Sequence, residues 1–248
     1  MKKLTILIFV FVLCLSLLCG CEAGKTETPQ GFTETTVPVT EVQADYEEIY
    51  GEILNSTYSL ITSDKTGIKI SEAETGIAEA VAGIEADKAL GVVGYTFKDL
   101  SGDGFCELVI ADVADSEESW YKSSEIFAVY GMVNGTPFPV VAGRARSSYK
   151  LLDDGTFFYE GSSGAAYNGV GNFRMSQGGT ALICNEFYFT EPDETDVSKV
   201  YVYKNKTGKW NTKNSEKTQL TGDEFSDIRK SFQEKAVTLE LTPFSDYK

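Results

Sequence analysis

The feature that most constrains the fold is a long series of short segments, from about residue 94 onward, in which apolar and polar residues alternate. A period of two places successive side chains on opposite faces of a β-strand. Turn-forming residues separate many of these segments, for example Asn134-Gly135 and Asp153-Asp154-Gly155. Because short turns of this kind join antiparallel strands, the pattern predicts a mainly antiparallel β-sheet. The predicted strands are Gly94–Lys98, Glu107–Val113, Glu125–Val133, Phe138–Val141, Ser148–Leu152, Thr156–Glu160, Asn172–Met175, Ala181–Phe189, Lys199–Lys204, Lys209–Thr212 and Val237–Leu241.

Helical spacing of apolar residues flanks this series on both sides. Asp45–Thr62 and Ser71–Leu90 each carry their large apolar residues near one helical face, and Ser71 with Glu74 forms a capping-box pattern. Thr221–Lys235 has the same spacing and predicts a C-terminal helix. The sequence therefore predicts one α+β domain over residues 44–248, with two N-terminal helices, a mainly antiparallel sheet and one C-terminal helix.

The first 21 residues differ in composition from the predicted domain. Met1-Lys2-Lys3 is basic, and the apolar run Leu4–Leu18 is shorter than the roughly 20 residues that span a membrane. It ends in Leu18-Cys19-Gly20-Cys21, which resembles the bacterial lipobox. The resemblance implies that residues 1–20 are a lipoprotein signal peptide and that Cys21 receives a lipid and becomes the new N-terminus. An ordinary signal peptide that happens to end in cysteines is the alternative.

Residues 21–43 are rich in Thr, Glu and Pro and contain few large apolar residues, so we predict a disordered tether. With a lipid anchor, the domain would lie at the extracellular face of the cell membrane. Removal of residues 1–20 takes away two of the 22 basic residues and none of the 37 acidic ones, which leaves a net charge of −17. Such a charge repels nucleic acid and favours cations. We expect no nucleic-acid partner.

The absence of histidine and the small number of cysteines limit the kinds of catalytic and metal site that this chain can form. The chain has no histidine, which excludes Ser-His-Asp and Cys-His catalysis and the usual zinc sites. A metal site would have to use oxygen ligands. Only Cys106 and Cys184 lie in the predicted domain, and both sit in apolar, strand-like runs. Reduced, buried thiols are the favoured interpretation, and a disulfide between them is the alternative.

One short segment carries a specific chemical pattern. Oxygen-bearing side chains stand at positions 1, 3, 5 and 9 of the segment Asp99–Glu107. A glycine at position 6 permits the sharp turn that brings the position 7 carbonyl inward, and this spacing suits calcium. Position 12, Ile110, lacks the acid of an EF-hand. The predicted ligands are Asp99, Ser101, Asp103, Phe105 through its carbonyl, and Glu107.

The segment resembles the Asp-x-Asp-x-Asp-Gly loops of FG-GAP and VCBS-type extracellular β repeats. In those repeats the loop joins two antiparallel strands and the position 9 acid closes the site. This chain has a single such loop, with Ser101 at position 3, so a complete propeller is not implied. A solvated Asp-Gly hairpin without metal is the alternative. With Gly143–Tyr149 and Asp154-Gly155, the stretch Tyr95–Ile110 also resembles uncharacterised lipoproteins of anaerobic Gram-positive bacteria, which implies a surface location.

Three weaker patterns suggest a ligand. Arg144, Arg146 and Tyr149 belong to the one compact basic cluster and are suited to hold a carboxylate or a sugar, although such arginines often pair with nearby acids. The small residues of Gly161–Gly169 form either a ligand-facing loop or a simple hairpin. Trp210, or Trp120 with Tyr121, offers a stacking face for sugars or, alternatively, packs into the core.

These patterns favour a non-enzymatic surface module that binds a glycan or a protein, with a structural calcium loop. No set of catalytic groups stands out in the sequence, and acid–base chemistry would have to rely on side chains other than histidine. The alternative function is a carboxylate-dependent hydrolase of glycans. That reaction would require two acids at a suitable separation in an open cleft.

Overall fold

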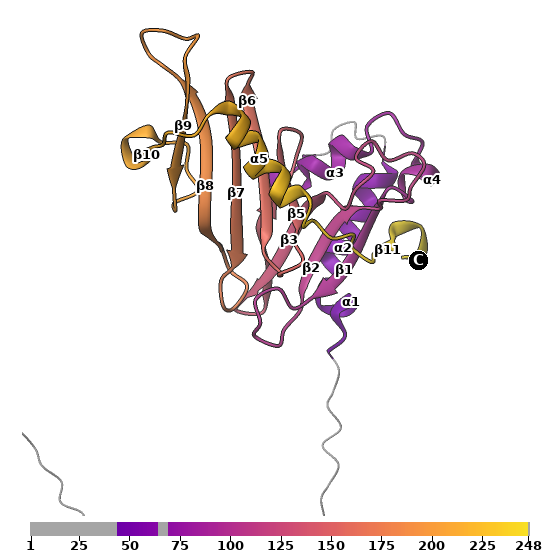
Figure 1. Cartoon of the computed structure of the whole chain (residues 1–248). Coiled ribbons are helices and arrows are strands. Elements are labelled where there is room, and N and C mark those ends of the chain that lie inside the picture. The colour runs from indigo at the N-terminus through magenta and orange to yellow at the C-terminus, as the bar shows by residue number, and fades with distance from the viewer. Residues whose placement is uncertain (1–43, 64–68, 248) are drawn as a thin grey trace, which may run out of the picture. The chain divides into compact units, whose positions relative to one another are not determined.

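The computed structural model describes residues 44–63 and 69–247 (Figure 1). The predicted signal peptide, the lipidated Cys21 and the tether at residues 21–43 lie outside the described residues. Residues Ala44–Lys248 form a compact unit. The described strands form a single antiparallel sheet in the order β10-β9-β8-β7-β6-β5-β3-β2-β1-β11, and β4 pairs with β3 beside this path. The predicted α+β class with a mainly antiparallel sheet is therefore confirmed.

The elements have the following bounds. The helices are α1 (Tyr46–Ile49), α2 (Gly51–Thr62), η1 (Glu72–Glu74), α3 (Thr75–Ala80), α4 (Ala86–Ala89), η2 (Thr212–Asn214), α5 (Gly222–Gln233) and η3 (Phe244–Asp246). The strands are β1 (Val93–Lys98), β2 (Glu107–Asp112), β3 (Ile126–Val133), β4 (Thr136–Ala142), β5 (Ser147–Leu151), β6 (Phe157–Gly164), β7 (Tyr167–Met175), β8 (Leu182–Pro192), β9 (Val200–Asn205), β10 (Glu216–Lys217) and β11 (Thr242–Pro243).

Several element boundaries differ from the sequence-based prediction. The predicted helix at residues 71–90 is divided into η1, α3 and α4, because a turn that contains Gly83 at φ 78° interrupts it. The predicted strand Lys209–Thr212 is wrong, since the chain enters η2 there and β10 follows. The predicted strand Val237–Leu241 is also wrong. This segment packs its apolar side chains beneath the sheet and has no continuous strand partner; only the short β11 after it pairs, with β1.

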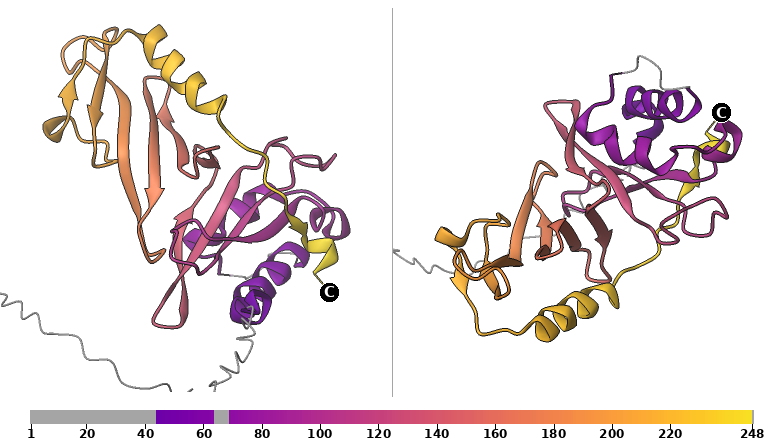
Figure 2. Two further views of the ribbon diagram at one scale, coloured as in Figure 1. Left: turned by 60° about the horizontal axis from the view of Figure 1, so that its bottom comes forward. Right: turned by 90° about the horizontal axis from the view of Figure 1, so that it is seen from above.

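Three apolar cores hold the sheet. The N-terminal helices cover one face of β1–β3, where Leu108, Ile110 and Tyr130 are buried. Val109 and Val129 point to the opposite face and pack in a second core with residues 237–241. Helix α5 packs on β6–β9 and forms the third core. Figure 2 shows α5 and the N-terminal helices on opposite sides of the molecule.

The sheet is weakly connected in its middle. Strand β3 pairs with β4 along most of its length, but it pairs with β5 only between Ile126 and Tyr149. The chain after α5 crosses at this point, where the Val237 N–H donates to the Leu151 carbonyl and the Leu239 N–H donates to Ser124 Oγ. Strands β1–β4 and β5–β10 therefore form two halves, each with its own helical cover. No helix in the described part of the chain is long and apolar enough to span a bilayer.

Candidate functional site

The predicted calcium loop joins β1 and β2, as the sequence pattern required. The Asp99 carboxylate accepts hydrogen bonds from the Gly102 N–H at 2.6 Å and the Gly104 N–H at 2.9 Å. Both glycines have positive φ, 75° and 88°, which side chains larger than hydrogen rarely permit. Some loss of hydration within the loop raises the pKa of the exposed Asp99, but these N–H donors outweigh it and hold the pKa below its usual value. The Asp103 carboxylate accepts from the Phe105 N–H at 2.8 Å.

Glu107 is the buried acid of the loop. Glu107 is only 2% exposed. Its Oε2 accepts hydrogen bonds from the Leu100 N–H at 2.7 Å and the Ser101 N–H at 3.2 Å. Burial raises the pKa of Glu107 despite these bonds. Among the described residues no lysine or arginine forms an ion pair with Glu107, and buried Ser101 Oγ has no hydrogen-bond partner.

Neighbouring elements fix the loop from two sides. The Phe105 ring packs edge-on against Tyr46 of α1, with ring centroids 5.2 Å apart, and the Tyr46 hydroxyl accepts from the Cys106 N–H at 3.1 Å. On the other side lies the β7–β8 turn. A Cβ on Gly179 would stand 2.2 Å from Glu107 Oε1, so only glycine lets this turn approach the acid.

The loop thus places all five predicted ligands, Asp99, Ser101, Asp103, Phe105 and Glu107, in one connection, but it does not gather them around a common point. Within the described residues no group of three or more Asp, Glu, Cys or His side chains is arranged to hold a metal. Asp99 and Asp103 face backbone N–H groups of their own loop. The oxygen-only donor set, the unpartnered Ser101 Oγ and the uncompensated Glu107 suit a hard cation. Calcium at this loop stays a prediction.

The basic cluster lies on a tight turn between β4 and β5. Arg144 and Ser147 exchange two backbone hydrogen bonds, each 2.9 Å long, so Ala145 and Arg146 are the central residues of the turn. Arg146 has φ 64°. This left-handed conformation costs a residue with a Cβ about 1–2 kcal/mol, and glycine would adopt it freely. A long cationic side chain at such a position is unusual enough to suggest a functional reason.

The two arginines have different environments. Arg144 pairs with Glu72 of η1 at 3.5 Å, and the neighbouring Ala145 N–H donates to Glu79 of α3 at 2.7 Å. In the described part of the chain, the Arg146 side chain has neither an ion pair nor a hydrogen bond. The expectation that such arginines pair with acids therefore holds for Arg144 and not for Arg146.

Tyr149 is placed differently from the sequence-based hypothesis. Its ring packs against Tyr159, with centroids 5.1 Å apart, and burial raises its pKa. Tyr149 lies beside Tyr159 on the neighbouring strand β5, but only Tyr159 lines the space that the arginines face.

That space is a cavity of about 450 Å³, here called the Arg146 cavity. Its volume falls in the range of about 300–1,000 Å³ that is usual for small-molecule sites. It lies on the face of β6–β8 opposite α5, because Tyr159 and Phe187 alternate with Phe158 and Tyr188 of the third core. The lining residues are Arg144, Ala145, Arg146, Ser147, Tyr159, Ser162, Ser163, Tyr167, Glu191 and Trp210.

The cavity joins three patterns that are separate in the sequence: the arginine turn, the Gly161–Gly169 hairpin and Trp210. Trp210 rests on Phe187 and Phe189, with ring centroids 5.9 and 5.8 Å apart, and is still 36% exposed. A Cβ on Gly169 would lie 2.5 Å from the Trp210 ring. Glycine in β7 therefore leaves the space in which the indole lies.

Sequence reasoning missed two members of this lining, Tyr159 and Glu191. Neither carries a local signal, because a Tyr in β6 and a Glu near the end of β8 look like ordinary strand residues. The second stacking candidate is not part of the cavity: Trp120 is 78% exposed on the β2–β3 connection, and Tyr121 packs against Phe127.

Two buried carboxylates were also missed. Asp112 is fully buried and accepts a short hydrogen bond from the Ser119 hydroxyl, which orders the β2–β3 connection. Glu125 is 6% exposed and lies 3.7 Å from the Lys150 ammonium. Burial raises the pKa of both acids. Neither of them lines the Arg146 cavity.

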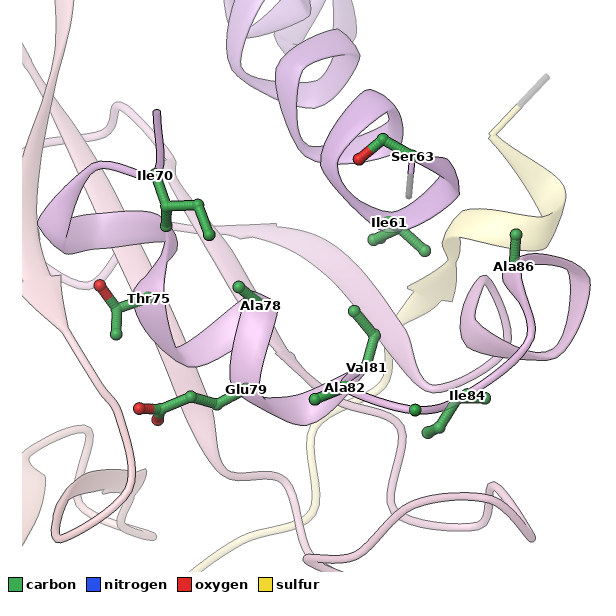
Figure 3. Close-up of a pocket in the computed structure, with 11 residues that line it drawn as sticks. Ile61, Ser63, Ile70, Thr75, Ala78, Glu79, Val81, Ala82, Ile84 and Ala86 are labelled. Carbon is green, nitrogen blue, oxygen red and sulfur yellow. The ribbon is translucent and has the colours of Figure 1, made fainter. Parts of the chain in front are cut away.

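A larger cavity of about 590 Å³ lies among α2, α3 and α4. Figure 3 shows Ile61 near Ala78 and Val81, with Glu79 pointing away from them. Its lining is mostly small and apolar, and Glu79 is the one acid among the described residues that line it. Because the Glu79 carboxylate accepts from Ala145 of the arginine turn, this acid has a structural role.

Both domain cysteines are free thiols, as the favoured interpretation has it, but they are half-buried and not buried. No known protein family, curated protein or solved structure matches this chain.

Proposed function

We propose that this protein is a lipid-anchored extracellular module that binds a saccharide ligand in the Arg146 cavity without catalysing a reaction on it. One observation carries the proposal: a cationic turn, a hairpin of small residues and an exposed indole meet at one cavity of ligand size. Flat aromatic faces beside hydrogen-bonding groups suit the alternating apolar and hydroxyl surfaces of sugars.

The composition of the cavity favours binding over hydrolysis. A two-carboxylate glycosidase needs a second acid about 5–9.5 Å from the first. Among the described residues, the lining of the Arg146 cavity supplies Glu191 as its one acid. A carboxylate-dependent hydrolase remains the alternative function, and release of reducing sugar from a bound oligosaccharide would establish it.

The membrane anchor is the second part of the proposal. It rests on the lipobox-like Leu18–Cys21, with the lipid on Cys21. A Cys21→Ala chain should lose labelling by a lipid precursor and appear in the soluble fraction. Retention of this variant in membranes after a high-salt wash would contradict the lipid anchor.

The third part is a structural calcium ion at the Asp99–Glu107 loop. Glu107 is a buried carboxylate without a cationic partner among the described residues, and Ser101 Oγ beside it is buried and unpartnered. Burying an uncompensated charge is costly, and a bound cation would offset that cost. Asp99, Ser101, Asp103 and Glu107 would hold the ion through side-chain oxygens, and Phe105 through its carbonyl.

The binding function is tested with residues 44–248, the compact unit that contains all three cores. A glycan array should give a defined set of binders, and Tyr167→Ala should weaken them. Tyr167 is 40% exposed, so its removal should leave the thermal midpoint nearly unchanged. Trp120→Ala, which removes a 78% exposed ring away from the cavity, is the matched control. An array without binders, or equal binding by both variants, would refute the saccharide proposal.

A further inference from the structure

The two arginines that line the Arg146 cavity differ in whether they have an acidic partner among the described residues. Arg144 is engaged with Glu72 at 3.5 Å. The Arg146 side chain is exposed, and within the described residues it contacts no acid at ion-pair distance. In a chain with 37 acidic and 22 basic residues, Arg146 is therefore a positive charge in the cavity lining that is open to an anionic ligand.

The backbone around Arg146 is held firmly. Its carbonyl accepts from the Ser162 N–H at 3.0 Å, which ties the turn to the β6–β7 hairpin. The Ala145 N–H is bound by Glu79. The turn thus keeps Arg146 in a left-handed conformation, φ 64°, at the edge of the cavity. The guanidinium is a planar fork that pairs with a carboxylate through two parallel hydrogen bonds.

The cavity also presents two aromatic faces beside this cation. Trp210 and Tyr167 are 36% and 40% exposed, and Trp210 is backed by Phe187 and Phe189. The apolar face of a pyranose ring can stack on such rings, while Ser162, Ser163 and Glu191 offer hydrogen bonds to its hydroxyls.

We propose that the ligand of the Arg146 cavity is an acidic saccharide, a uronic-acid type sugar whose carboxylate pairs with Arg146 and whose ring stacks on Trp210 or Tyr167. This inference rests on the proposed saccharide-binding function and names its ligand class. A singly charged carboxylate fits better than a phosphate dianion, since the lining has one unpaired arginine and also the acid Glu191.

The test uses residues 44–248 and matched oligosaccharides. Oligomers of galacturonic and glucuronic acid are compared with their methyl esters, which keep the sugar and remove the charge. Calorimetric titration should show tighter binding of at least one acid, by about 10- to 100-fold, as expected for a charge-assisted hydrogen-bonded pair. A sugar phosphate of similar size should bind more weakly than the acid.

Arg146→Gly separates binding from folding, because glycine accepts the left-handed turn without strain. This variant should keep or raise the thermal midpoint and lose the preference for the acid over its ester. Arg174→Gln removes the same charge from an exposed position of β7 outside the cavity and should keep that preference.

The outcomes distinguish the two proposals. Equal affinity for acid and ester, or an acid preference that survives in Arg146→Gly, would overturn the acidic-sugar inference and leave saccharide binding intact. Stronger binding of the sugar phosphate would overturn it as well. The absence of any saccharide binder would overturn both proposals.

Discussion

Two turns of this protein, the Asp99–Glu107 loop and the Arg144–Ser147 turn, both require positive φ angles but place different types of residue at them. In the first, the residues at positive φ are glycines, and the carboxylates accept hydrogen bonds from their own loop. In the second, the residue at positive φ is Arg146, and its side chain contacts no acid in the described part of the chain. The aspartates of the first turn are hydrogen-bonded within their own loop. The second turn keeps a strained residue whose charge has no acidic partner among the described residues.

The difference shows what each turn depends on. The loop carries its chemistry in consecutive residues, so its hydrogen bonds form wherever β1 and β2 pair. The arginine turn depends on Glu79 and Ser162, which come from α3 and β6. A turn whose hydrogen bonds come mainly from its own residues suits a structural role, and a strained turn with an unpaired cation suits ligand binding.

The largest expected loss of stability comes from a substitution in the β7–β8 turn that places a new atom against Glu107. Gly179→Ala should destabilise the domain by about 3 kcal/mol, because the new Cβ meets Glu107 Oε1 in addition to the strain at φ 63°. This corresponds to a decrease of roughly 10 °C in the thermal midpoint. Gly178→Ala is the control, since φ there is 84° with nothing within 4 Å, and only about 1–2 kcal/mol should be lost. Equal losses of stability in the two variants would mean that the β7–β8 turn does not pack against Glu107.

Calcium removal should give the next largest effect if the loop holds the ion. With a dissociation constant on the order of 10⁻⁴ to 10⁻³ M, about 10 mM calcium stabilises the folded state by roughly 1.4–2.7 kcal/mol. The thermal midpoint of residues 44–248 should therefore rise by about 5 °C between EDTA and calcium. Asp103→Ala should lose this response. Identical midpoints for the intact domain in both solutions would rule out a calcium role.

A smaller effect of opposite sign is expected at the second turn. Arg146→Gly should stabilise the domain by about 1 kcal/mol, because glycine removes the strain at φ 64°. Asn134→Gly is the matched control: Asn134 has φ 50°, and asparagine tolerates this conformation well. Chemical unfolding should show a gain for Arg146→Gly and little change for Asn134→Gly. A loss of stability in Arg146→Gly would show that the Arg146 side chain stabilises the fold by more than the backbone strain destabilises it.

The smallest effect concerns Glu125, which lies beside β5, the strand that follows the arginine turn. Burial raises its pKa, although the Ser148 hydroxyl and the Lys150 ammonium act in the opposite direction. An acid with a raised pKa in the folded state contributes stability at low pH, and this contribution is lost as the pH rises from the unfolded value of about 4.3 through the folded one. Glu125→Gln should therefore gain stability relative to the unmodified domain as the pH rises above about 4.3. A difference independent of pH would contradict a raised pKa.

Local sequence was a good guide to the strands and a poorer one to the ends of the domain. The period of two located β1–β9 to within a few residues, except that β6 and β7 extend farther into their shared hairpin. It failed for Lys209–Thr212 and Val237–Leu241, because alternation does not supply a partner strand. Val237–Leu241 alternates in order to fill the second core as the chain crosses between the halves of the sheet.

The sequence by itself determined the features that consecutive residues can satisfy. The Asp99–Glu107 loop is one, since its glycines and acids supply both the turn and its hydrogen bonds. The start of α5 is another, where Thr221 and Glu224 cap each other. Only the tertiary structure decided that Arg144 pairs with Glu72, that Arg146 stays unpaired within the described residues, and that Trp210 reaches the same cavity. The physical reason is that strand pairing across β5–β9 and the space left by Gly169 bring these residues together, and neither is encoded in the spacing of any one segment.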